Sequence, residues 1–229
     1  MLSAGCVVIT QVEPSLVAGA VAGLGGAAAG AAAVRCAKRC FDVGLQPAWT
    51  TAACIATGAV LALRVGAGPF LAPLLAFGWA GVVISAVDLR THLIPTRLLR
   101  ACVAIAVPLM CAAAVLDGGL AGLARASAAA ATGATLGWGA MRVIWRVARG
   151  GLGYGDVRLG GYLGLHLGLG GLAAVWAGLL AGFAIAAAVG AVGMVALGRS
   201  ADHRFALGPS LVAGALAAAW WFPPPGLAA

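Results

Sequence analysis

The stretch from residue 172 to residue 196 contains no charged side chain, and seven other stretches of the chain are nearly as apolar. A helix that crosses a lipid bilayer needs about 20 predominantly apolar residues. Over all 229 residues, 63% are hydrophobic and 9% are charged, and the mean hydropathy is +1.06. A soluble domain of this size could not bury so much apolar surface. The sequence therefore predicts an integral membrane protein.

We predict an all-α fold, a polytopic bundle of about eight membrane-spanning helices. The predicted spans are residues 15–34, 48–64, 70–87, 99–116, 126–145, 157–169, 172–196 and 206–222. Glycines at small-residue spacing, as in residues 19–33, favour close helix packing in a bilayer. The longest polar connections, about 35–47, 88–98 and 146–158, are too short to enclose a soluble core.

Basic residues are distributed unevenly between the two sides of this predicted bundle. If successive loops alternate sides, Arg64 and Arg125 fall on one side, and the other side holds 12 of the 14 Lys and Arg residues. These are Arg35, Lys38, Arg39, Arg90, Arg97, Arg100, Arg142, Arg146, Arg149, Arg158, Arg199 and Arg204. Because cytoplasmic loops carry the Lys/Arg excess, this side is predicted to be cytoplasmic. The net charge of +8 is also compatible with contact to anionic lipid headgroups, and no basic helix or aromatic platform indicates nucleic acid as a partner.

Two of the six acidic residues adjoin hydrophobic spans on the predicted cytoplasmic side. Asp88 directly follows the apolar run AFGWAGVVISAV, and Asp156 opens VRLGGYLGLHLG behind Gly153 and Gly155. An ionisable residue at such a place indicates a functional site. The two glycines free the backbone for conformations closed to other residues and allow an extended peptide to come close. We expect the two acids to meet at one membrane face.

Two carboxylates in a site that partly excludes water hold one shared proton near neutral pH, because adjacent like charges do not ionise together readily. The ionised member can take a proton from water while the protonated member donates to a peptide carbonyl, as in aspartic proteases. The sequence offers no Ser–His pairing, HExxH metal motif or Gly-rich phosphate loop that would compete. We therefore expect no metal and no cofactor. His166, in an apolar run, is interpreted as a packing or pore-lining residue.

Three segments resemble the motifs of one family. GYGDVRLGGYLG, residues 153–164, resembles the GxGD motif of membrane aspartic proteases and, in its fuller pattern, that of bacterial type IV prepilin peptidases. VDLRTHLIPTRLL, residues 87–99, resembles the family's other catalytic segment, in which Ile-Pro follows an Asp. RFALGPSLVAGAL, residues 204–216, resembles its terminal segment, in which Gly-Pro opens the last helix. The matches occur in the family's order and cover most of residues 75–220.

This resemblance implies that Asp88 and Asp156 are the catalytic pair and that Gly153 and Gly155 shape the backbone beside the second acid. It gives supporting positions to Arg90, Pro95, Arg158, Gly208 and Pro209. Arg90 and Arg158, each two residues after an acid, are either topology signals or stabilisers of a negatively charged pair.

The chain also departs from the family in places. Thr96 stands where Asn is usual after Ile-Pro, and Arg158 stands where Lys is common. The run ALGPS, residues 206–210, stands where a Phe-Gly-Pro-Phe type of sequence is typical. None of these departures involves an acid, so they bear on substrate fit more than on chemistry.

A larger departure lies near the start of the chain. Bifunctional members of the family carry a cytoplasmic domain with two CxxC pairs between their first two spans, and this domain is associated with methylation of the new N-terminus. Here the interval is only RCAKRCFDVGLQPAW. We therefore predict a peptidase without methyltransferase activity, and we interpret Cys36 and Cys40 as ordinary juxtamembrane cysteines or a relic. The predicted parts are N-terminal spans with a short cytoplasmic stub (1–70), a prepilin-peptidase-like membrane domain (71–222) and a tail (223–229).

The implied function is cleavage of the short basic leader from a type IV prepilin or pseudopilin-like precursor at the cytoplasmic face of a bacterial cell membrane. The charge distribution independently places both aspartates at that face. Three alternatives stay open. One is a protease of the presenilin or signal-peptide-peptidase type, whose Pro-Ala-Leu motif is absent here. The others are a small proton- or cation-coupled transporter that uses the same acids and a non-catalytic membrane subunit.

Overall fold

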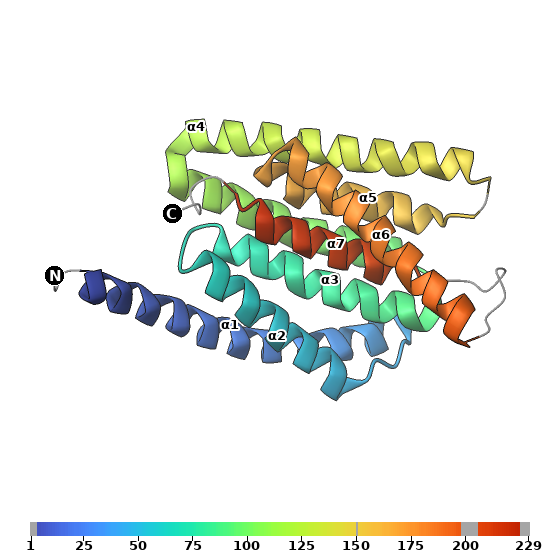
Figure 1. The fold of residues 1–229 in the computed structure, drawn as a ribbon, viewed down its shortest axis with the longest axis horizontal. Helices are drawn as coiled ribbons and strands as arrows, with labels where there is room; N and C mark the ends of the chain where they lie inside the picture. The colour runs from blue at the N-terminus through green and yellow to red at the C-terminus, as the bar shows by residue number, and fades with distance from the viewer. Residues whose placement is uncertain (1–3, 150, 198–205, 225–229) are drawn as a thin grey trace.

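A computed structural model of the chain describes residues 4–149, 151–197 and 206–224. Every regular element in these ranges is helical, as predicted for the all-α class. In chain order the elements are α1 (Ala4–Phe41), α2 (Pro47–Val65), α3 (Leu71–Thr91), α4 (Thr96–Val147), α5 (Tyr154–Leu167), the 3₁₀ turn η1 (Gly168–Gly170), α6 (Leu172–Leu197) and α7 (Gly208–Trp221). The helices lie side by side along one common direction and form an elongated bundle (Figure 1).

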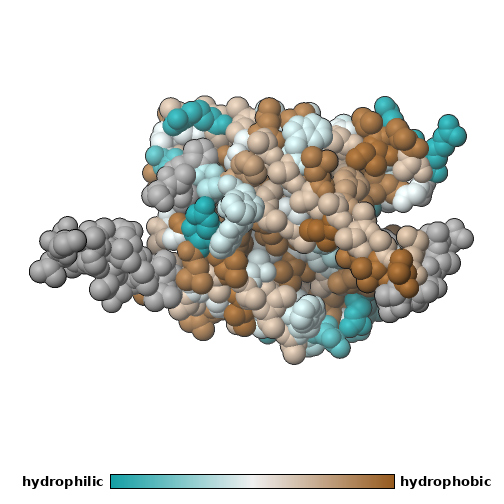
Figure 2. Space-filling view, in the orientation of Figure 1, coloured by the Kyte–Doolittle hydropathy of each residue, from teal (hydrophilic) through white to brown (hydrophobic). Residues whose placement is uncertain are grey.

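Five of these helices are long and apolar enough to cross a membrane. They are α1 over Val17–Cys40, α2, α3, α4, and α6 over Leu172–Val195. The face in view in Figure 2 is mostly apolar, with hydrophilic residues gathered toward its ends. Helices α5 and α7 have 14 residues each, fewer than the about 20 needed to cross the hydrocarbon core. The multi-pass character is therefore supported, whereas the predicted number of about eight spans is not confirmed.

The first connection is shorter than predicted. Helix α1 continues to Phe41, so that the polar loop expected over residues 35–47 is reduced to residues 42–46. Lys and Arg are good helix formers, and basic side chains interact favourably with the C-terminal end of a helix, so the basic run extends α1 beyond its apolar part. Cys36 and Cys40 are exposed on these last turns.

The predicted spans 99–116 and 126–145 both lie in α4, which folds back on itself. Gly118 (φ −153°, ψ 23°) and Gly119 (φ 60°, ψ −147°) leave the helical region. The positive φ at Gly119 is accessible to glycine because it has no Cβ. Figure 1 shows the two arms of α4 running side by side after this turn. The reversal therefore needs two residues, whereas the predicted spans leave a loop over residues 117–125.

Helix α5 packs against the second arm of α4 with direct backbone contact. A Cβ at Gly137 would overlap the carbonyl oxygen of Gly160, and a Cβ at Gly133 would overlap that of Gly164. On each helix these glycines are separated by three residues, the small-residue spacing that lets membrane helices approach closely. This contact fixes the position of α5, because a helix of 14 residues is too short to be held in place by crossing the bilayer.

The glycine-rich stretch 19–33 of α1 packs closely against α2. A Cβ at Gly26 would lie 2.6 Å from the Cys54 carbonyl oxygen, and a Cβ at Gly30 would lie 2.6 Å from the Cα of Thr51. The packing role predicted for these glycines is confirmed.

Most basic residues lie at one end of the bundle. The ends of α1 and α3, the starts of α2, α5 and α7, and both ends of α4 lie at this end, on the right of Figure 1. Ten of the twelve residues predicted to share a side belong to these regions: Arg35, Lys38, Arg39, Arg90, Arg97, Arg100, Arg142, Arg146, Arg149 and Arg158. Arg199, Arg204 and residues 225–229 of the predicted tail are outside the described residues. We call this end the basic end.

The close contact between α4 and α5 predicts a clear difference between two neighbouring glycines. Gly137→Ala should lower the free energy of unfolding by about 1–3 kcal/mol, because the added methyl group overlaps the backbone of α5. Gly139→Ala is the matched control, since its methyl group would meet nothing within 4 Å. This control should leave stability unchanged or raise it by up to about 1 kcal/mol. Denaturant unfolding in detergent micelles measures both, and equal effects would contradict the contact.

Candidate active site

Asp88 lies in the last turn of α3, and its side chain is only 4% exposed. The helix ends one turn later, where His92 adopts a left-handed conformation (φ 51°) and donates its N–H to the Asp88 carbonyl oxygen at 2.8 Å. Pro95 then takes the N-cap position of α4. The polar connection predicted over 88–98 is therefore reduced to residues 92–95, and Asp88 is held within a helix.

Asp156 lies in the first turn of α5, and its side chain is half-buried. Gly153 is the N-cap residue, and its carbonyl oxygen accepts the Asp156 N–H at 3.1 Å. A Cβ at Gly153 would lie 3.2 Å from Asp156 Oδ2, so this glycine borders the carboxylate directly. The connection expected over 146–158 is also shorter, because α5 begins at Tyr154.

Two contacts join the Asp88 segment to the Asp156 segment. Arg158 Nη1 donates to Thr96 Oγ1 at 2.6 Å. A Cβ at Gly155 would lie 3.1 Å from the Cβ of Ile94. The missing side chain of Gly155 therefore makes room for Ile94 of the same chain, which differs from the clearance for a substrate that the sequence suggested.

The third segment contacts Asp88 directly. The Gly208 N–H, at the first residue of α7, donates to Asp88 Oδ2 at 2.9 Å in a buried hydrogen bond. The first N–H groups of a helix have no partner within the helix, and the helix dipole favours a negative charge there. A Cβ at Gly208 would lie 2.7 Å from the same oxygen, so any other residue would displace the carboxylate. Pro209 follows in the first turn of α7, where it removes no needed donor.

The surroundings of Asp156 shift its pKa. Asp156 lies outside the five membrane-spanning segments. Burial raises the pKa of Asp156, and the negative charge of Asp88 raises it further, to about 6. The segments that carry the two acids are in contact through Arg158 with Thr96 and through Gly155 with Ile94. The fold therefore brings together residues that are far apart in the sequence, from α3 and α5.

The remaining predicted positions do not contact the acids directly. Arg90 is exposed and makes no hydrogen bond or ion pair with any residue that the structure describes. Arg158 binds Thr96, and its guanidinium lies over the Tyr154 ring at 4.7 Å from the centroid. Sequence reasoning missed Thr96 and Tyr154 as partners of Arg158. The only signal for either was its position inside a motif.

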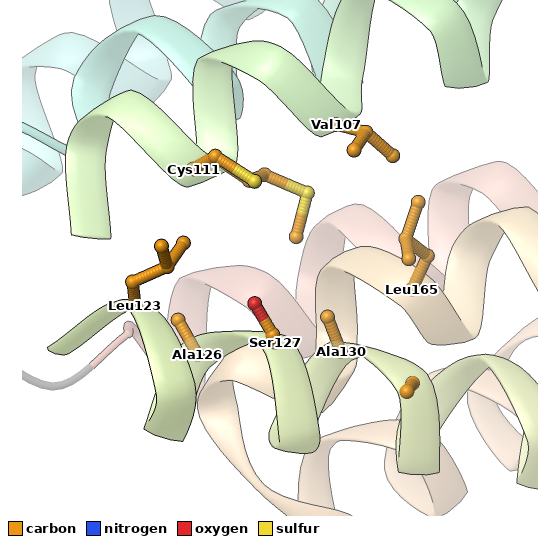
Figure 3. A pocket seen from close by; sticks show the side chains of 9 residues that line it. Val107, Cys111, Leu123, Ala126, Ser127, Ala130 and Leu165 are labelled. Carbon is orange, nitrogen blue, oxygen red and sulfur yellow. The ribbon is translucent and has the colours of Figure 1, made fainter. Parts of the chain in front are cut away.

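Two other features of the bundle are separate from this site. A pocket between the two arms of α4 and α5 carries one hydroxyl group, that of Ser127, and none of the predicted site residues lines it (Figure 3). His166 is buried with its ring stacked on Phe77 at 4.5 Å, and its Nδ1 lies 3.2 Å from the Tyr162 carbonyl oxygen. The stacking agrees with the packing role expected for His166, but its buried Nε2 has no hydrogen-bond partner among the described residues.

Comparison with protein-family models, curated proteins and solved structures finds no match for this chain. Function is therefore inferred from the geometry of the three converging segments and from the resemblance of their motifs.

The negative charge of Asp88 predicts how Asp156 titrates. Asp88→Asn should lower the pKa of Asp156 from about 6, because it removes a neighbouring negative charge. Carbon-13 NMR of the aspartate carboxyl groups in micelles measures this value, with Asp156→Asn to assign the signal. Asp117→Asn, at the far end of the bundle, is the matched control and should change nothing. An unchanged Asp156 pKa in Asp88→Asn would show that the two groups do not interact.

Proposed function

We propose that this chain is a membrane aspartic endopeptidase that removes the leader from type IV prepilin-like precursors. The observation that carries this proposal is the convergence of three motif segments, which carry Asp88, Asp156 and Gly208 and are joined by two hydrogen bonds, from Gly208 to Asp88 and from Arg158 to Thr96. The order and content of these motifs resemble those of prepilin peptidases.

The chemistry follows from the different surroundings of the two acids. Asp88 accepts a backbone hydrogen bond from Gly208, which stabilises a carboxylate. The raised pKa of Asp156 favours it as the holder of the shared proton. Asp88 then takes a proton from the attacking water while Asp156 donates its proton to the carbonyl oxygen of the scissile peptide. Asp88 then passes its new proton to the leaving nitrogen while Asp156 takes a proton back from a hydroxyl group of the tetrahedral intermediate, so the peptide bond breaks and the singly protonated pair is regenerated.

The position of the acids supports cleavage near a membrane boundary. Asp88 is in the last turn of a membrane-spanning helix, and Asp156 is in the first turn of α5. Both are at the basic end of the bundle, the end that the positive-inside rule assigns to the cytoplasm of a bacterial cell. In a prepilin-like precursor the basic leader meets the apolar helix at this level. A presenilin-like enzyme, which cuts within the membrane, fits these positions less well.

The short first connection supports a peptidase without methyltransferase activity. The connection between α1 and α2 is residues 42–46, which leaves no room for a domain that could carry methyltransferase activity.

Two residues that depart from the family's usual motifs, Thr96 and Arg158, contact each other at 2.6 Å. Thr96 is shorter than the usual Asn, and Arg158 is longer than the usual Lys. The longer side chain reaches the shorter one, so the two segments remain joined.

The proposal predicts that both acids are needed for cleavage. With a pilin-like precursor reconstituted in the same vesicles, Asp88→Asn and Asp156→Asn should each lower the cleavage rate by about 10²-fold or more, because proton transfer is lost. Asp117→Asn is the control and should cleave normally. Thermal unfolding of each variant separates lost chemistry from lost folding.

The same variants separate the alternatives. Full cleavage by a folded Asp88→Asn or Asp156→Asn protein would refute the catalytic pair. Proton-coupled flux that depends on both acids, in the absence of any cleavage, would instead identify a transporter. Folded protein with neither activity would indicate a non-catalytic membrane subunit.

A further inference from the structure

Two arginines and two aromatic rings form a cluster where α4 ends and α5 begins. The guanidinium carbon of Arg142 lies 4.4 Å from the ring centroid of Trp145 and 5.6 Å from that of Tyr154. The guanidinium carbon of Arg158 lies 4.7 Å from the Tyr154 centroid, on a ring that meets Trp145 edge to face at 5.5 Å. We call these four residues the arginine–aromatic cluster.

The aromatic rings hold the two guanidinium groups in place without neutralising them. Cation–π contact orients an arginine side chain while leaving its in-plane N–H donors free for other partners. Arg158 uses one donor on Thr96. The Nη1 atom of Arg142 is buried and has no hydrogen-bond partner among the residues that the structure describes.

No described carboxylate neutralises the cluster. The only ion pair among the described residues is Lys38–Asp42, on α1 and the connection that follows. A buried charged donor without an acceptor is unfavourable, so an anion that reaches Arg142 gains a strong, charge-assisted hydrogen bond. The planar fork of a guanidinium fits the oxygens of a phosphate group.

The surroundings of the cluster match the headgroup level of a membrane. Trp and Tyr favour the interface between lipid and water. On the same last turns of α4, Val143 is 60% exposed and Val147 is 76% exposed, so apolar surface adjoins the arginines. A molecule with a phosphate group and acyl chains can therefore contact both the guanidinium groups and the apolar side of α4.

We propose that the arginine–aromatic cluster binds a phosphate group, supplied by an anionic phospholipid of the leaflet at the basic end. A soluble phosphate would offer the same oxygens without acyl chains, and the experiment below distinguishes the two sources. Phosphate binding at this site does not depend on peptidase activity, so the experiment tests it independently of the proposed function. Its occupant lies against the first turn of α5, because Tyr154 and Arg158 flank Asp156 in that turn.

Lipid binding to the purified protein tests this site. In detergent micelles, dioleoyl phosphatidylglycerol should raise the thermal midpoint and remain bound in native mass spectrometry, whereas dioleoyl phosphatidylcholine should do so much less. Arg142→Gln and Arg158→Gln should each weaken phosphatidylglycerol binding by about tenfold or more. Arg146→Gln is the matched control, because Arg146 is exposed on the same turns and makes no described aromatic contact.

The outcomes are distinct. Inorganic phosphate that protects wild type as well as the lipid does, and fails with Arg142→Gln, would assign the site to a soluble phosphate. Equal affinities of Arg142→Gln, Arg158→Gln and Arg146→Gln for both probes would overturn the proposal. Arg158 is exposed, so its variant provides the test even if Arg142→Gln folds poorly.

Discussion

The proposed site depends on the close packing of α5 against α4, which is possible because the glycines at this contact have no side chains. Helix α5 has 14 residues and cannot be anchored by spanning the bilayer. Its position is set by backbone contact with the second arm of α4, at pairs such as Gly137 and Gly160. Because Asp156 is in the first turn of α5, this contact decides where the second acid lies. The position of Asp156 at one end of the bundle therefore depends on helix packing along the length of the bundle.

The first acid is positioned by different means. Asp88 is fixed by its helix, by the left-handed turn at His92 that ends it, and by the Gly208 N–H at the start of α7. A buried carboxylate needs such a donor, since burial without compensation is unfavourable. Three helices thus meet at the pair, and each contributes one motif. This convergence explains why short motifs scattered along the chain can act as one unit.

The sequence predicted the helical class, because long apolar runs are a local signal, and it singled out Asp88 and Asp156, which the structure places at the basic end on α3 and α5. It did not predict that α1 continues to Phe41, since hydropathy marks the membrane-embedded part of a helix and not its polar extension. It also did not predict the turn at Gly118 and Gly119, because glycines in an apolar run resemble packing positions. The Thr96–Arg158 bond joins residues 62 positions apart. Such contacts depend on how helices pack, which no local pattern encodes.

The positive charge of the basic end connects the proposed peptidase with the proposed phosphate site. A basic leader would approach an end of the bundle that carries ten described Lys and Arg residues, and like charges repel within a Debye length of about 8 Å in physiological salt. Anionic headgroups gathered by the arginine–aromatic cluster would reverse the local sign of charge beside Asp156. The arginines of the basic end would then also recruit the anions that a basic substrate requires. A bilayer rich in anionic lipid is therefore part of the environment in which the carboxyl pair should work.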